Sequence, residues 1–240
     1  MKKIVSLILL LVLTTNCMSY KVNLAFNLIG IYDDEVKTTK LINDNKEVIF
    51  IPMHHIGTKS FYSDVAKKVD SLENLGFYFY TEWVKRSKND TITFLKMRKL
   101  TGVPFSINKS GYMVLFDSMF AGKIKYKKEL IDQPKYEAMG VDSLVGRNVD
   151  VALHEMIQYY ETKYGELKLE KCDYETAINK KSNCKGKSIK LEHRNDAILN
   201  FRNNHIIKEL QKDTHQKIAI IYGARHFIGI KEELLKLGYK

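Results

Sequence analysis

Three short stretches of the sequence place a histidine, a glutamate or an arginine directly after an apolar run. His54 and His55 follow "EVIFIP", Glu82 lies at the end of "FYFYTEW", and Arg225 and His226 follow "KIAIIYG". Side chains beyond the carboxyl ends of parallel strands line the crevice in which α/β proteins bind ligands. If the three runs are neighbouring parallel strands, these residues belong to one site.

Two imidazoles and one carboxylate are a common ligand set for a catalytic divalent metal ion with one position open to water. The sequence offers His55, His226 and Glu82 for this role. A metal bound in this way lowers the pKa of its water to about 7 and supplies a hydroxide nucleophile. Without a metal, a histidine and a glutamate can act together as a general base that activates water. The residues leave both mechanisms open.

Other polar residues extend the predicted site. Arg194 and Asn195, in "EHRNDAI", begin a predicted helix, where the guanidinium can face a carboxylate or a developing negative charge. We assign both to catalysis together with Glu82. Gly223 lets the backbone approach a ligand closely, and we assign it to substrate binding. We assign His54 and Arg225, which directly precede His55 and His226, to the same role.

Each of these residues also has an ordinary structural interpretation. A histidine at a strand end is often only a hydrogen-bonded structural residue. Glu82 can be an ion-paired surface carboxylate, and Arg194 can pair with Glu192 or Asp196. The common position of the residues at one sheet edge favours the site over these separate explanations.

Apolar periodicity predicts the elements that position the site. Runs of β-branched and aromatic residues predict strands, and apolar residues at helical spacing predict helices. Short connections between strand, helix and strand are typical of parallel sheets. The sequence therefore predicts an α/β fold with a mixed or mostly parallel sheet flanked by helices. The predicted strands are residues 47–52, 77–83 and 217–223, and the predicted helices are residues 61–75, 194–212 and about 227–237.

The chain has 240 residues, 45% of them hydrophobic, which is enough for one substantial core. Only three prolines occur and no repeat or low-complexity segment separates two parts. We therefore expect a single domain over residues 18–240. Within it, residues 91–165 show mainly helical spacing and are interpreted as a helical insertion packed on the sheet.

The first 17 residues have the pattern of an export signal. Lys2 and Lys3 precede an apolar run from Ile4 to Leu13, and "TTNC" ends at Cys17. The run is too short for a membrane-spanning helix, which needs about 20 residues. A cysteine at this place predicts lipidation and a membrane-anchored lipoprotein that faces the periplasm or the cell exterior. Ordinary signal cleavage is the alternative.

Two cysteines remain after Cys17, and both lie in the stretch "CDYETAINKKSNC". In an exported chain such a pair predicts a disulfide, here between Cys172 and Cys184. The formal net charge of +11 is spread over the chain, with dense lysine patches at residues 123–128 and 180–190. No recognition motif accompanies the charge, so we expect no nucleic-acid partner.

Four motifs follow one another along the chain in a fixed order. They are "PMHH" at 52–55, "YTEW" at 80–83, "HRND" at 193–196 and "GARHFIG" at 223–229. This order resembles the TraB, PrgY and GumN-like proteins, which are related to the Tiki metalloproteases and more distantly to erythromycin esterases. The resemblance covers residues 45 to 240.

The resemblance implies a hydrolase, metal-dependent and peptidase-like. It places His55, Glu82, Arg194, Asn195 and His226 in the active site. Two positions depart from the family pattern. A proline, Pro52, stands where the first motif has glycine, and Arg225 stands where a small residue is usual.

The expected function is therefore that of an exported hydrolase, with a divalent metal ion as cofactor and a peptide or a related amide or ester as substrate. The alternative is a non-catalytic protein that binds haem or a peptide signal in the same crevice. A third hypothesis is an interaction protein that uses the basic face around Lys123, Lys125 and Lys127.

Overall fold

A computed structural model describes residues 18–86, 90–104, 111–184 and 189–240. The predicted signal segment 1–17, with its lipidation site Cys17, lies outside the described residues. In the described part of the chain, no helix has the length and hydropathy needed to cross a bilayer.

The centre of the protein is a five-stranded sheet. Its strands are β1 (Thr39–Ile42), β2 (Glu47–Met53), β4 (Tyr78–Thr81), β6 (Gly146–Asn148) and β7 (Lys217–Gly223). They lie in the order β1-β2-β7-β4-β6, and all neighbours are parallel except β1 and β2. The predicted α/β class with a mostly parallel sheet is confirmed. The carboxyl ends of four parallel strands therefore meet at one edge of the sheet.

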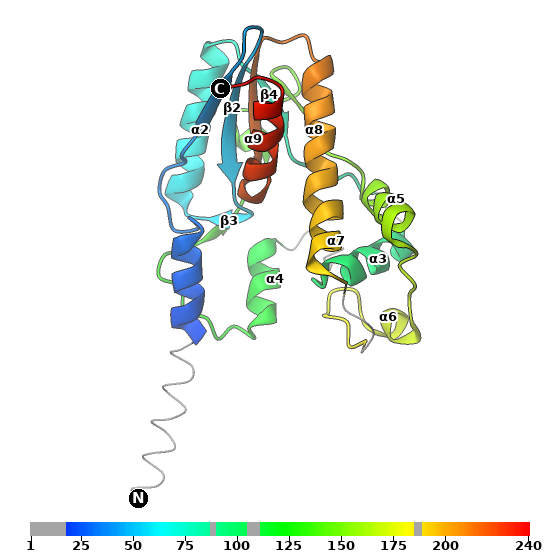
Figure 1. The fold of residues 1–240 in the computed structure, drawn as a ribbon. Coiled ribbons are helices and arrows are strands. Elements are labelled where there is room, and N and C mark those ends of the chain that lie inside the picture. Colours follow the sequence, from blue (N-terminus) through cyan, green and yellow to red (C-terminus); the bar gives the residue numbers. More distant parts are fainter. Residues whose placement is uncertain (1–17, 87–89, 105–110, 185–188) are drawn as a thin grey trace, which may run out of the picture.

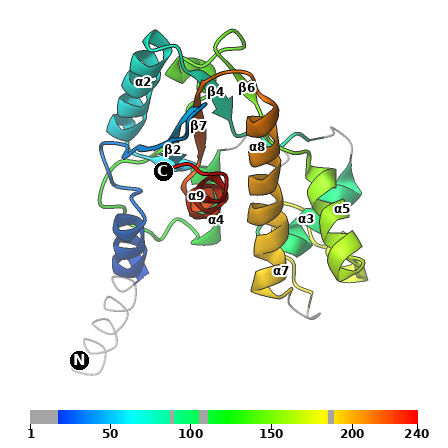
Figure 2. The same ribbon diagram turned by 45° about the horizontal axis from the view of Figure 1, so that its top comes forward.

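Helices cover both faces of the sheet (Figures 1 and 2). The covering helices are α2 (Lys59–Asn74) on one face and α8 (Phe201–Lys212) and α9 (Phe227–Lys236) on the other. Strand β7 shows why helices are needed on both faces of the sheet. Its alternate residues Ala219 and Ile221 pack with α2, while Ile218 and Ile220 pack with α8 and α9, and all four are fully buried.

Local sequence explains the boundaries of α2. The hydroxyl of Thr58 accepts a hydrogen bond from the Phe61 amide and caps the first turn, so the helix begins at Lys59, two residues before the predicted start. Buried residues recur at positions 61, 65, 69 and 72, one face of a helix. Packing of this face holds α2 against the sheet and positions the connection between β2 and α2, which contains His54 and His55.

The stretch from 91 to 165 contains strands as well as the helices expected there. Its last strand, β6, is an edge strand of the main sheet. A short pair joins β5 (Ile131–Asp132) to β3 (Ile56–Gly57), which follows β2 in the chain. Helices α3 (Thr91–Thr101) and α5 (Leu153–Tyr164) pack together with the π-helix Asp196–Asn200 in a separate hydrophobic cluster. The remaining elements are α4 (Tyr112–Met119), the 3-10 turn Tyr136–Met139, α6 (Lys171–Glu175), α7 (Leu191–Asn195), which directly precedes the π-helix, and the 3-10 turn Ala224–His226.

The predicted disulfide between Cys172 and Cys184 is present, and its loop encloses a buried arginine of α3. Arg98 is 1% exposed and donates hydrogen bonds to the carbonyl oxygens of Asp173, Thr176 and Ala177 at 2.5 to 2.9 Å. The guanidinium therefore satisfies three backbone carbonyl groups of this segment at once.

Replacing Arg98 by methionine should lower the free energy of unfolding by about 3 kcal/mol, because the carbonyl groups of Asp173, Thr176 and Ala177 each lose a hydrogen bond from the guanidinium. Urea denaturation followed by circular dichroism measures the change. Lys171→Met is the matched control, since the Lys171 side chain is 88% exposed. It should cost less than about 0.5 kcal/mol. Equal stability of Arg98→Met and the wild type would show that the guanidinium does not hold the segment.

Candidate functional site

A buried arginine lies at the carboxyl edge of the sheet and binds two carboxylates at once. Arg202, on α8, donates through Nε and Nη2 to the two oxygens of Asp150 at 2.9 and 2.7 Å. Nη2 also donates to Oε1 of Glu82 at 2.5 Å. Burial opposes the charge, but the bonds to Asp150 and the nearby carboxylates outweigh it and raise the Arg202 pKa. The guanidinium is therefore a permanent cation inside the protein.

His226 is held in one tautomer by two partners. Its Nδ1 lies 2.7 Å from Oδ1 of Asn203, which can only accept, so Nδ1 carries the proton. Its Nε2 lies 3.0 Å from Nη1 of Arg202 and accepts a hydrogen bond there. Burial, together with the positive charges of Arg202 and Arg225 and the nearby His55, lowers its pKa to about 2. The ring is neutral and both of its nitrogens are engaged.

Glu82 is fixed at both carboxylate oxygens. Oε1 accepts from Arg202, and Oε2 accepts from the backbone N–H of Gly223 at 2.5 Å. A Cβ at position 223 would lie 3.0 Å from Oε2, so glycine leaves the carboxylate the room to reach this N–H. Oε1 of Glu82 also lies 3.9 Å from Nε2 of His226. The structure thus brings together Glu82, Gly223 and His226, as expected from the sequence.

The sheet and α8 explain this arrangement. Glu82 follows β4, Asp150 follows β6, and His226 follows β7, so three adjacent strands deliver them to one edge. Arg202 and Asn203 come from the start of α8, directly after the π-helix. A π-turn shifts the phase of the following helix, and such turns occur often at functional sites. Here the shift precedes the two residues that contact His226.

A histidine with free ring nitrogens lies near this cluster. The His55 ring stacks on Tyr112 of α4 at 4.2 Å between ring centres and is exposed to solvent. Among the described residues, no hydrogen bond to its ring nitrogens is found. Burial of the Tyr112 hydroxyl raises its pKa, with opposing contributions from Glu82 and Arg202. The tyrosine is thus within electrostatic range of the carboxylate and the guanidinium, and His55 is in range of His226.

His54 points elsewhere. Its ring packs 5.5 Å from that of Phe61, and burial lowers its pKa while the charge of Asp33 opposes the shift. Its backbone oxygen accepts from the hydroxyl of Tyr62. Within the described part of the chain, His54 makes no contact with Glu82 or His226, so the two adjacent histidines have different environments.

The predicted Arg194 and Asn195 do not reach Glu82 or His226 in the described structure. Nε of Arg194 donates to the carbonyl oxygen of Leu100, at the end of α3, at 2.9 Å. Asn195 contacts Arg225, whose Nη2 lies 3.5 Å from its Oδ1, and Arg225 is exposed. The bulky residue beside His226 therefore turns outward.

A second Arg-Asn pair, in "FRNNH", occupies the place expected for the first. Sequence reasoning missed Arg202 and Asn203, although a signal was present. Arg202 is four residues before Ile206 and eight before Leu210, so it falls on the apolar face of the helix. A charge on a buried helix face needs partners, and Asp150, also missed, supplies them.

The donor set His55, Glu82 and His226 does not fit a metal ion in this arrangement. Nε2 of His226, the nitrogen that faces Glu82, already accepts from Arg202. The guanidinium contacts both Glu82 and His226, so a fixed positive charge lies where a divalent cation would bind. The Arg202 guanidinium and a divalent metal ion cannot occupy this place at the same time.

Another group of side chains could hold a metal ion. The ligand atoms of Glu170, Cys172, Asp173 and Cys184 all lie within 4.8 Å of one another. The two sulfur atoms are joined in the disulfide, and thiolates are the form that binds metals. Asp173 is paired with Lys99 at 2.8 Å. This group lies in the α6 segment, apart from the sheet edge.

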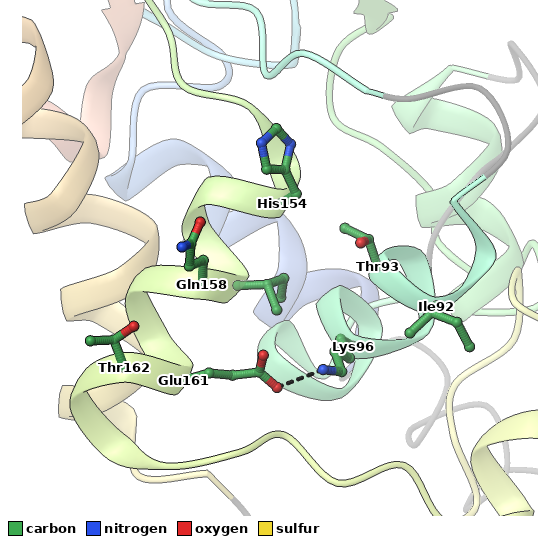
Figure 3. Close-up of a pocket in the computed structure, with 8 residues that line it drawn as sticks. Ile92, Thr93, Lys96, His154, Gln158, Glu161 and Thr162 are labelled. Atoms are coloured by element: carbon green, nitrogen blue, oxygen red, sulfur yellow. Dashed lines mark hydrogen bonds and ion pairs between the residues drawn. The ribbon is translucent and has the colours of Figure 1, made fainter.

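A surface hollow lies between α3 and α5 (Figure 3). Lys96 and Glu161 form an ion pair of 2.7 Å across it, and His154 lies at its rim. None of the predicted site residues lines this hollow.

Comparison of the chain with protein-family models, with curated proteins and with solved structures finds no match. The function must therefore be argued from the geometry of the site.

The neutral His226 makes stability depend on pH. Its folded pKa of about 2 lies below the ordinary value of 6.5, so below pH 6.5 the unfolded chain binds a proton that the folded chain does not. Stability from this group is complete above that pH and falls as the pH falls. Between pH 7 and pH 5 the wild type should lose about 2 kcal/mol more than His226→Gln. Urea denaturation at each pH measures the difference, and parallel profiles would contradict it.

Gly229, on α9, should be sensitive to a single methyl group. A Cβ there would lie 2.3 Å from Nδ2 of Asn203, the residue that holds His226. Gly229→Ala should lower the free energy of unfolding by about 1 to 3 kcal/mol through this overlap. The neighbouring Ile228 is 69% exposed, so Ile228→Ala is the matched control and should change stability little. Chemical denaturation compares the two, and equal effects would show that the site adapts to the methyl group.

Proposed function

We propose that the protein is a hydrolase of neutral esters or amides, including peptides, in which His55 activates water. The observation that carries the proposal is an exposed imidazole, for which the described residues show no hydrogen-bond partner, near a buried group of charged side chains at the carboxyl edge of a parallel sheet. This edge is where α/β folds bind ligands.

His55 is the residue suited to act as general base. A base needs a free ring nitrogen within reach of water, and the exposed His55 ring satisfies this, while stacking on Tyr112 limits its orientation. His226 does not satisfy it, because Arg202 occupies Nε2 and Asn203 occupies Nδ1. His226 is therefore a positioning residue that holds the guanidinium.

Arg202 is suited to stabilise the negative charge that develops on a carbonyl oxygen. Nη1 carries two hydrogens, and His226 takes one of them. Within the described residues, no partner is found for the other. A fixed N–H of this kind can act as an oxyanion donor without reorganisation. Glu82 and Asp150 lock the guanidinium in place.

Charge favours neutral substrates at the reacting centre. Glu82 and Asp150 carry two negative charges against the single positive charge of Arg202, while His226 is neutral. The contacting group is therefore net negative, which disfavours fully charged phosphate or carboxylate substrates more than a neutral carbonyl, on which negative charge only develops during the reaction. The motif order resembling TraB and GumN-like proteins also supports a hydrolase, with Arg202 and Asn203 in the place first given to Arg194 and Asn195.

We also propose that the chain is exported and anchored to a membrane through a lipid on Cys17, without a nucleic-acid partner. The support is the charged, apolar and cysteine pattern of residues 1–17. The disulfide is compatible with an oxidising compartment.

Hydrolysis of p-nitrophenyl acetate and of a p-nitroanilide peptide tests the function. Glu82→Gln and His55→Ala should each lower kcat/KM by about 100-fold or more, because the positioned carboxylate or the base is lost. His154→Ala is the control, since this histidine lies at the hollow beside α3 and should leave kcat/KM unchanged. Activity of the wild type should survive a metal chelator.

Two outcomes would contradict the proposal. Loss of activity with the chelator and recovery with a divalent ion would support the metal-dependent mechanism instead. Binding of the peptide without turnover, unchanged by His55→Ala, would favour the non-catalytic ligand-binding protein.

A further inference from the structure

The first described helix, residues 18–28, has apolar side chains on two opposite sides. Phe26 is buried against Phe116 of α4 and Tyr126, with ring centres 5.2 and 6.3 Å apart. The other side presents Tyr20, Leu24 and Leu28, which are 69%, 47% and 76% exposed. These three residues are spaced by four and form one stripe along the helix. Among the described residues no part of the protein buries the second stripe, and exposed apolar surfaces of this kind mark interaction sites.

Lysines surround the beginning of this helix. The segment 123–128 runs against its first turns, where Asn23 donates to the carbonyl oxygen of Lys125 at 2.8 Å and Ser19 accepts from the Lys125 amide at 3.1 Å. The side chains of Lys123 and Lys125 are exposed, as is that of Lys21 on the helix itself. Residues 18–28 and 118–128 contain no aspartate or glutamate. The surface is therefore basic without compensation by its own segments.

This surface lies at one end of the molecule. Helix 18–28 and α4 project together from the sheet on the side of β3, in the lower part of Figure 1. Met119, at the end of α4, is 53% exposed beside the lysine segment that follows it. The described structure begins with this helix, and residues 1–17, with the apolar run from Ile4 to Leu13, directly precede it in the sequence.

We propose that this surface, formed by helix 18–28 and the segment 118–128, docks the folded protein on a bilayer that carries anionic lipid headgroups. An apolar stripe beside lysines is the pattern of a helix that lies in the membrane interface. Lysines near a surface of anionic headgroups strengthen binding electrostatically. Attachment of the N-terminal segment would bring the surface to the bilayer, and docking would fix its orientation.

The inference does not depend on the proposed hydrolase activity, because neither Tyr112 nor any residue of the Arg202 cluster belongs to the surface. It differs from a lipid anchor as well, since the binding comes from exposed side chains of the folded part. A protein partner at the same place would not require anionic lipid.

Vesicle co-sedimentation of the full chain carrying Cys17→Ser tests the proposal, with residues 1–17 kept so that all variants share the same N-terminus. The reference chain should bind vesicles with about one-third phosphatidylglycerol about tenfold more tightly than pure phosphatidylcholine vesicles. High salt should remove most of this preference. Adding the triple change K21Q, K123Q and K125Q should reduce it about tenfold.

The matched control is the triple change K67Q, K208Q and K212Q, which removes the same charge from exposed lysines of α2 and α8. It should keep the preference for anionic vesicles. Leu24→Ser with Leu28→Ser should weaken binding to both kinds of vesicle, and thermal unfolding confirms that each variant is folded. The proposal is overturned if both lysine triples lose the preference equally, or if the reference chain shows no preference.

Discussion

The buried positive charge of Arg202 is the constraint on which the sheet edge depends. A guanidinium removed from water is costly unless its donors are paired, and here Asp150 and Glu82 supply the opposite charge. The partners come from the ends of β6 and β4, and the arginine comes from α8. The ion cluster therefore requires three elements, distant in sequence, to meet in one register. A small displacement of any of them would leave a charge unpaired, so the cluster favours a single arrangement over sliding alternatives.

Small residues make this close packing possible. The carboxylate of Glu82 passes close to Gly223 to reach its N–H, and the amide of Asn203 occupies the space that a side chain at Gly229 would need. Both glycines are in the motif "GARHFIG", which also contains His226. The motif is thus explained by steric and hydrogen-bonding demands around Arg202 and not by metal coordination. The backbone conformation does not require glycine at either position, because neither residue has a positive φ.

The sequence predicted those parts of the fold that follow from apolar pattern. Strands β2, β4 and β7 are runs of apolar or aromatic residues, and α2 and α8 repeat buried residues at helical spacing. Strand β6 has no such signal, because its three residues are glycine, arginine and asparagine. It joins the sheet through a close approach in which a Cβ on Gly146 would lie 2.7 Å from the Phe79 carbonyl oxygen. Such a contact depends on tertiary packing.

Tertiary structure also decides between the two Arg-Asn pairs, 194–195 and 202–203. Both lie in one continuous helical region, and the π-turn between them changes which residues face the sheet. Local spacing did not reveal that turn. The spacing of apolar residues still distinguishes the two arginines. Arg202 lies on the same buried helix face as Ile206, whereas the side chain of Arg194 reaches the end of α3. A fixed guanidinium in the position of a metal then changes the chemistry, since it can hold charge but cannot lower the pKa of a bound water as a metal does. In the proposed hydrolase a neighbouring base must therefore activate water, and among the described residues near the cluster His55 has an exposed ring with no hydrogen bond found at its nitrogens.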